Sequence, residues 1–246
     1  MRVIGVDGCR SGWLAAGLTQ SGECEARVFP NIESLFQQWG PGAMVLVDIP
    51  IGLRDRGPEQ RQCDALARKW LGWPRSASVF TPPARPALKA ASWEEANKIN
   101  RRAVNRGLSR QAWGIAGKIR EVDAFLRRDA SRQRHLREVH PELLFWALND
   151  RKAMTNNKKR PDGRRERLGV LERHWPGVED MFDRLRRELR GRKVGADDLI
   201  DALVSVVAPR ACGGQLQSIP EKAEYDDRGL RMEMLYPILP GAKRPA

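Results

Sequence analysis

The chain has 246 residues, of which 41% are hydrophobic and 30% charged, and its formal net charge is +13. This length and apolar content suffice for a buried core, and no apolar run approaches the roughly 20 residues that a membrane helix needs. The four cysteines are scattered without a CxxC pair, and an apolar strand follows the N-terminus without a basic then apolar leader. We therefore expect a cytoplasmic protein with reduced thiols, and neither a zinc ribbon nor a disulfide framework.

The first predicted element is an apolar strand that runs into an acidic residue. It lies in Arg2–Trp13 (RVIGVDGCRSGW), where Val3, Ile4 and Val6 predict a strand buried on both faces before Asp7. An Asp before Gly can cap a turn through nearby backbone amides, and it can also ligate a metal at the end of a strand. This stretch alone leaves both interpretations open.

Two further strands and a helix follow. Residues 13–18 and 24–28 are joined to the first strand and to each other by short turns, which predicts an antiparallel meander. Asn31 is a suitable cap for a helix over residues 32–39, which the Gly40-Pro41-Gly42 break ends.

The next strand repeats the first pattern, because the apolar run in Ala43–Pro50 (AMVLVDIP) ends on Asp48. A helix between two strands makes the second strand parallel to one already formed. Asp7 and Asp48 are then predicted at the same end of one sheet, where open α/β sheets place their active sites. Two carboxylates this close repel each other unless a cation lies between them.

The middle of the chain predicts helices and loops. An irregular region, residues 51–88, contains a helical pattern at about 58–71. Ser92 begins a helix that extends to about Arg106, and Ser109 begins another that extends through Arg128. We expect one domain spanning the whole chain, with a mostly helical and loop insertion at about 51–130.

A fifth strand, residues 135–139, runs into His140, Pro141 and Glu142 ahead of an apolar helix. Glu142 is thus a third acidic residue after a strand, although the dipole of the helix alone favours Glu after Pro in the first turn. His140 is either a packed or capping imidazole or a substrate contact.

The last strong helical pattern is Ala196–Ala208 (ADDLIDALVSVVA), and a final strand is expected at 230–236. On a helix, four polar residues lie within an arc of about 100°, opposite the apolar ones: Asp197, Asp198, Asp201 and Ser205. A first-turn or capping role explains one of the two adjacent aspartates. Asp201 lies one turn further in, where capping does not explain it.

Positive charge is concentrated in two segments. Residues 101–137 carry 11 Lys or Arg against 3 Asp or Glu, and a basic helical segment at about 151–193 carries 15 against 7. This excess predicts binding of nucleic acid, either DNA or RNA, and the alternative is an Arg-rich surface that only confers solubility. Four side chains are candidate substrate contacts: Arg10, Lys118, His140 and Arg164.

The strand-end and helix acids predict a metal site. The expected catalytic residues are Asp7, Asp48, Glu142, Asp198 and Asp201. The four aspartates among them would ligate two Mg²⁺ or Mn²⁺ ions about 3.5–4 Å apart, which activate water in phosphodiester hydrolysis. Asp7 is the candidate bridging ligand.

The order of elements and the placement of the four aspartates resemble the RNase H-like superfamily, in particular RuvC-type resolvases. The motifs GVDGCRSGW, VDIPIGL, RQCDALARKWLG, SVFTPPAR, EVHPELLF and DDLIDAL are similar to an uncharacterised bacterial domain-of-unknown-function family of predicted nucleases. The resemblance implies a mixed five-stranded sheet with helices on both faces, and a metal-dependent hydrolase acting on nucleic acid. Asp48 departs from the pattern, because RuvC-type enzymes usually have the longer Glu there.

Two other functions fit parts of the sequence. A phosphate-binding protein of the actin-like ATPase type would use the GVDG turn, but it would also have a duplicated domain, and no internal repeat is visible. A non-catalytic nucleic-acid-binding protein would keep the fold and the basic surface. Four tryptophans are candidates for base stacking in that case, although aromatic residues in helices more often belong to the core: Trp70, Trp73, Trp93 and Trp113.

Overall fold

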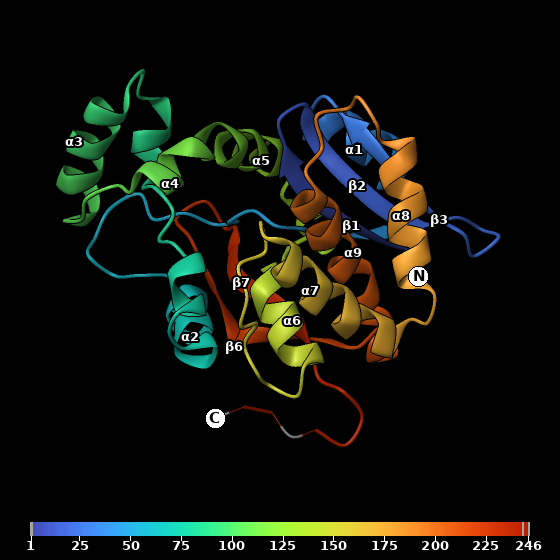
Figure 1. Ribbon diagram of the computed structural model, residues 1–246. Helices are drawn as coiled ribbons and strands as arrows, with labels where there is room; N and C mark the ends of the chain where they lie inside the picture. Colours follow the sequence, from blue (N-terminus) through green and yellow to red (C-terminus); the bar gives the residue numbers. More distant parts are fainter. Residues whose placement is uncertain (1, 243, 246) are drawn as a thin grey trace. The chain divides into compact units, whose positions relative to one another are not determined.

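A five-stranded mixed sheet organises the first part of the chain (Figure 1). The computed structural model describes residues 2–242 and 244–245. The sheet has the strand order β3-β2-β1-β4-β5. Its strands are β1 (Arg2–Cys9), β2 (Gly12–Leu18), β3 (Cys24–Phe29), β4 (Ala43–Val47) and β5 (Leu136–Glu138).

The pairing of the strands is the predicted one. β2 is antiparallel to both β1 and β3, whereas β4 is parallel to both β1 and β5. The meander of three strands and the two added parallel strands are therefore confirmed. A second sheet pairs β6 (Leu216–Tyr225) with β7 (Arg231–Pro237). The sequence predicted β7 but not β6, which has several charged and polar residues and no clear alternation.

The described residues divide into two compact units. Unit 1 comprises the described parts of 1–48, 135–217 and 235–246 and contains the five-stranded sheet. Its helices are α1 (Ile32–Trp39), α6 (Pro141–Leu148), α7 (Pro161–His174), α8 (Val178–Glu188) and α9 (Ala196–Ala211). In Figure 1, α1 lies behind β2 while α8 and α9 lie in front of the sheet, so helices cover both faces as expected.

Unit 2 comprises residues 49–134 and 218–234. Its helices are α2 (Gln62–Leu71), α3 (Trp93–Val104), α4 (Arg110–Gly114) and α5 (Ala116–Arg128). The prediction of a single helix from Ser109 to Arg128 is wrong, since Ile115 separates α4 from α5. Gly114 and Gly117 flank this break, and glycine is a poor helix former. The Ser109 hydroxyl does cap α4, because it accepts a hydrogen bond from the Ala112 amide at 3.0 Å.

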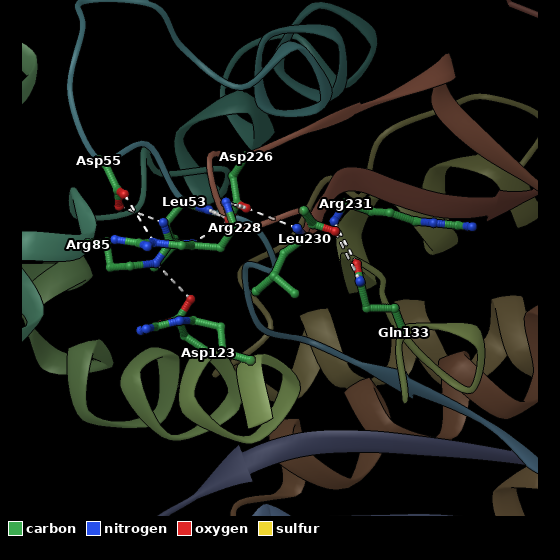
Figure 2. Close-up of polar contacts among 11 residues, drawn as sticks. Leu53, Asp55, Arg85, Asp123, Gln133, Asp226, Arg228, Leu230 and Arg231 are labelled. Atoms are coloured by element: carbon green, nitrogen blue, oxygen red, sulfur yellow. Dashed lines mark hydrogen bonds and ion pairs between the residues drawn. The ribbon is translucent and has the colours of Figure 1, made fainter. Parts of the chain in front are cut away.

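A buried arginine holds distant parts of unit 2 together, as Figure 2 shows. The Arg85 guanidinium donates from Nε to Asp123 Oδ1 at 3.0 Å, from Nη1 to Asp55 Oδ1 at 2.5 Å, and from Nη2 to Asp226 Oδ2. Asp226 also accepts from the backbone amides of Leu53 and Leu230, both at 2.9 Å. A single cation thus connects the loop after β4, helix α5 and the turn between β6 and β7.

Helix α9 packs directly on β1, and this contact positions the candidate site. A Cβ atom at Gly5 would lie 2.0 Å from the Ala202 carbonyl oxygen, so only glycine allows this close approach. Alternate residues of a strand face the same side of a sheet. Asp7, two residues after Gly5, therefore faces α9. None of the helices in the described part of the chain has the length and hydropathy that a membrane crossing requires.

Candidate active site

Asp7 and Asp48 lie side by side at one edge of the pairing between β1 and β4. The parallel register ends at Val6 opposite Val47, and the Asp48 amide donates to the Val6 carbonyl oxygen at 2.9 Å. Asp7 is 9% exposed, and its Oδ1 atom accepts a hydrogen bond from the Gly8 amide at 2.6 Å. The expectation that the strand ends at Asp7 is wrong, because β1 continues to Cys9 and Asp7 and Gly8 pair with Leu14 and Trp13 of β2. Asp7 instead marks the end of the parallel pairing with β4, where it stands next to a second carboxylate.

Helix α9 adds two more carboxylates from its first turns. Asp201 is 1% exposed, and Asp198 is half-buried. Asp198 Oδ2 accepts from the Gly195 amide at 2.8 Å, so Asp198 is the capping aspartate of the Asp197 and Asp198 pair. Asp198 also contributes to the raised pKa of Asp7, which places its charge near the strand-end acids. The structure thus brings Asp7, Asp48, Asp198 and Asp201 together.

The carboxylates raise one another's pKa values. Burial, followed by the negative charges of Asp48 and Asp201, holds the pKa of Asp7 well above its ordinary value. Burial is also the largest cause of the shift at Asp48 and Asp201, where the pKa rises to about 6 from an ordinary 3.8. The cluster therefore carries uncompensated repulsion when its members are ionised.

A lysine that the sequence analysis missed lies in the same cluster. Lys158, from the loop between α6 and α7, donates from Nζ to Asp201 Oδ2. Its charge lowers the pKa of Asp7, Asp48 and Asp201. Burial opposes the charged form of Lys158, but the three aspartates raise its pKa above the ordinary value. Nothing in the sequence distinguishes this lysine from the other cations of the basic segment 151–193.

Glu142, the third strand-end acid, lies in the first turn of α6 and is 6% exposed. Its Oε1 atom accepts from Nη2 of Arg167, whose side chain is fully buried, whereas its buried Oε2 atom has no hydrogen-bond partner among the described residues. The Glu142 charge contributes to the raised pKa of both Asp48 and Asp201, so it lies beside the cluster. Arg167 was also missed, because its partner is distant in the sequence.

The carboxylate oxygens of the cluster are chemically suited to binding a hard divalent cation. Carboxylate oxygens are the ligands that Mg²⁺ and Mn²⁺ prefer, and a cation would relieve the repulsion that raises the pKa of Asp7. The unpartnered Glu142 Oε2 is a further oxygen beside this set. Across residues 2–242 and 244–245, no group of three or more His, Cys, Asp or Glu side chains is placed so that it could hold a metal ion as it stands. In this arrangement the Lys158 ammonium is the cation in contact with Asp201.

A family model described as "Protein of unknown function (DUF429)" matches residues 5–225. The chain belongs to the DUF429 family. The predicted resemblance to a domain-of-unknown-function family is thereby confirmed, and the match includes all five predicted catalytic acids. No curated protein and no solved structure matches the chain. Membership of DUF429 thus assigns a family without an activity.

The four candidate substrate contacts of this DUF429 chain lie in different places. Arg10 is exposed in the turn between β1 and β2, and Arg164 is half-buried on α7. His140 is the half-buried residue before α6, and its carbonyl oxygen accepts from the first-turn amides of that helix. Lys118 lies on α5, in the unit that does not contain the carboxylates.

The basic segments are divided between the two units. Residues 151–193 belong to unit 1, whereas 101–134 belong to unit 2. In the first of these, many cations are exposed, including Arg151, Lys152, Lys159, Arg165, Arg187 and Arg190. Of the four candidate stacking tryptophans, Trp73 in unit 2 is 86% exposed and the others are half-buried. Binding of nucleic acid remains a prediction, with Trp73 as the best-exposed aromatic candidate.

Proposed function

We propose that this DUF429 protein is a divalent-metal-dependent nuclease that hydrolyses phosphodiester bonds of nucleic acid. The observation that carries the proposal is the convergence of Asp7 and Asp48, from adjacent parallel strands, with Asp198 and Asp201 of α9. The raised pKa values of these acids support it, because carboxylates with perturbed pKa values are typical of functional sites. A capping role alone explains Asp198 but not Asp201.

The sheet supports an RNase H-like fold for unit 1. This interpretation expects three antiparallel strands followed by two parallel ones, with acids at the ends of the first and fourth strands and on a late helix. The strand order β3-β2-β1-β4-β5 and the positions of Asp48 and Asp201 agree with that expectation. Asp7 lies two residues before the end of β1, where the parallel pairing with β4 stops.

The proposal gives the side chains distinct roles. The four aspartates would hold Mg²⁺ or Mn²⁺, which acts as a Lewis acid and lowers the pKa of bound water. Lys158 holds Asp201 in place and keeps positive charge beside the site. The exposed cations of 151–193 would contact the phosphate backbone, so binding should weaken steeply as salt rises.

The test is a cleavage screen over single-stranded, duplex, hybrid and branched substrates with Mg²⁺, Mn²⁺ or Ca²⁺. We expect cleavage with the first two ions only, and a loss of about 10²-fold or more in Asp201→Asn. Asp183→Asn is the matched control, since Asp183 is exposed on α8 in the same unit. Cleavage that persists in chelator, or that is equal in both variants, would contradict the proposal. Salt-dependent binding without cleavage of any substrate would favour the non-catalytic nucleic-acid-binding alternative.

A further inference from the structure

The loop that carries Lys158 is fastened on both sides of the lysine. Before it, the amides of Thr155 and Asn156 donate to the Glu166 carboxylate at 2.6 and 2.8 Å. After it, the Arg160 amide donates to the Asn157 carbonyl oxygen at 2.9 Å. The loop is therefore shaped by its own hydrogen bonds, so that Lys158 is presented to the cluster.

The buried pair of Arg167 and Glu142 joins this loop to the candidate site. Arg167 Nη1 donates to the Asn156 carbonyl oxygen at 3.1 Å, and its Nη2 donates to Glu142 Oε1. Arg167 is 0% exposed, and removing either member would leave a buried charge unpaired. Movement of the loop backbone that carries Lys158 would thus disturb a contact made by a buried arginine.

The two sides of the carboxylate cluster differ in how well their oxygens are compensated. On the α9 side, Asp201 Oδ2 accepts from the Lys158 ammonium and Asp198 Oδ2 accepts from the Gly195 amide. Glu142, in the first turn of α6, has a buried Oε2 atom without a hydrogen-bond partner among the described residues, and its charge acts on both Asp48 and Asp201. The Lys158 ammonium therefore contacts Asp201 directly, whereas it acts on Asp7 and Asp48 through its charge at longer range.

We propose that Lys158 is the resident cation on the Asp201 side of the cluster, so that the site takes one divalent ion, on the side of Asp7 and Asp48. The inference rests on the proposed function and revises the two-ion expectation drawn from the sequence. A second divalent ion at Asp201 would have to share its carboxylate with an ammonium group of like charge. A positive charge and a divalent ion about 6 Å apart repel enough to weaken binding about tenfold, even with the dielectric constant of water.

The test counts Mn²⁺ ions bound to the full-length protein by equilibrium dialysis, with electron paramagnetic resonance spectra of the bound ions. The wild type should bind one ion and give the spectrum of an isolated Mn²⁺. Lys158→Met keeps an apolar stem without the charge, so it should bind two ions and hold the first about tenfold more tightly. Lys159→Met, an exposed lysine of the same loop, is the matched control and should resemble the wild type.

Two results would overturn the inference while leaving the proposed function intact: two ions in the wild type, or one ion in Lys158→Met. If Lys158→Met does not fold, the number of Mn²⁺ ions bound to the wild type still tests the inference. Lys158→Arg keeps the positive charge and should also bind one ion. No Mn²⁺ bound to the wild type at all would reject the metal site itself, and the proposed function with it.

Discussion

Asp7→Asn should change the stability of the protein in opposite directions with and without metal. The amide keeps an oxygen that can accept the Gly8 amide hydrogen bond, so the variant removes mainly the negative charge. Without metal, that charge is buried and faces Asp48 and Asp201. Neutralising it should leave the metal-free protein more stable.

The size of the effect follows from the pKa values in the cluster. Asp201 is almost fully buried, and its pKa is raised from 3.8 to about 6. A shift of roughly two units corresponds to roughly 3 kcal/mol of unfavourable interaction when the group is ionised at neutral pH. The shift at Asp7 has the same direction and the same first cause, burial. Single substitutions typically change the unfolding free energy by about 0.5–3 kcal/mol, so we expect Asp7→Asn to gain an amount in this range without metal, an increase of roughly 1–12 °C in Tm.

Metal should reverse the order of the two proteins. Wild type gains about 4.1 kcal/mol when Mn²⁺ is present at about 1,000 times its Kd, provided that the ion binds only the folded state. Asp7→Asn lacks one ligand and should lose most of this gain. Thermal melts at pH 7.5, each with chelator and with Mn²⁺, measure all four stabilities, and Asp183→Asn should behave like wild type.

Two outcomes would refute this reasoning. Equal Mn²⁺-induced shifts in wild type and Asp7→Asn would show that Asp7 is not a metal ligand. A variant that is less stable by about 1 kcal/mol or more, with and without metal alike, would show that Asp7 is a structural acceptor whose charge-assisted hydrogen bond from the Gly8 amide stabilises the fold.

Four further predictions concern other parts of the chain. Because Asp201 has a raised pKa in the folded state, its contribution to the metal-free unfolding free energy is greatest below pH 4 and falls by roughly 3 kcal/mol between about pH 4 and pH 6. Urea denaturation should show a smaller fall in Asp201→Asn than in wild type, and the remaining fall comes from Asp7 and Asp48, whose pKa values are also raised. Gly5→Ala should lower the unfolding free energy by about 1–3 kcal/mol or more because it overpacks against α9, and so should lower Tm. A Cβ at Gly117 meets no atom within 4 Å, so Gly117→Ala should be neutral or stabilising; thermal melts of both variants check this. Arg85→Leu should cost about 3–5 kcal/mol in urea denaturation because it leaves buried carboxylates unpaired, and a cost under 1 kcal/mol would contradict that role. Trp73→Ala should leave stability unchanged but weaken single-stranded oligonucleotide binding by about 1–3 kcal/mol in fluorescence anisotropy, and unchanged binding would exclude stacking on Trp73.

Much of the fold of unit 1 could be predicted, because its signals are local. The apolar runs before Asp7 and Asp48 indicate strands, and the helix between them requires a parallel neighbour. The same local logic failed for β6, whose LQSIPEKAEY sequence has several charged and polar residues and no clear alternation. It also failed at Ile115, because α4 ends at Gly114 and α5 begins at Ala116.

The sequence by itself determined which carboxylates meet. Acids that follow adjacent parallel strands must lie at one edge of the sheet. Helical spacing places Asp201 one turn inside α9. Only the tertiary structure decided which cations face them. Lys158 lies 43 residues before Asp201, and Arg167 lies 25 residues after Glu142. Basic side chains are abundant in this part of the chain and show no periodic pattern. Which of them pairs with an acid depends on the path of the loop between α6 and α7. Local sequence patterns do not specify that path.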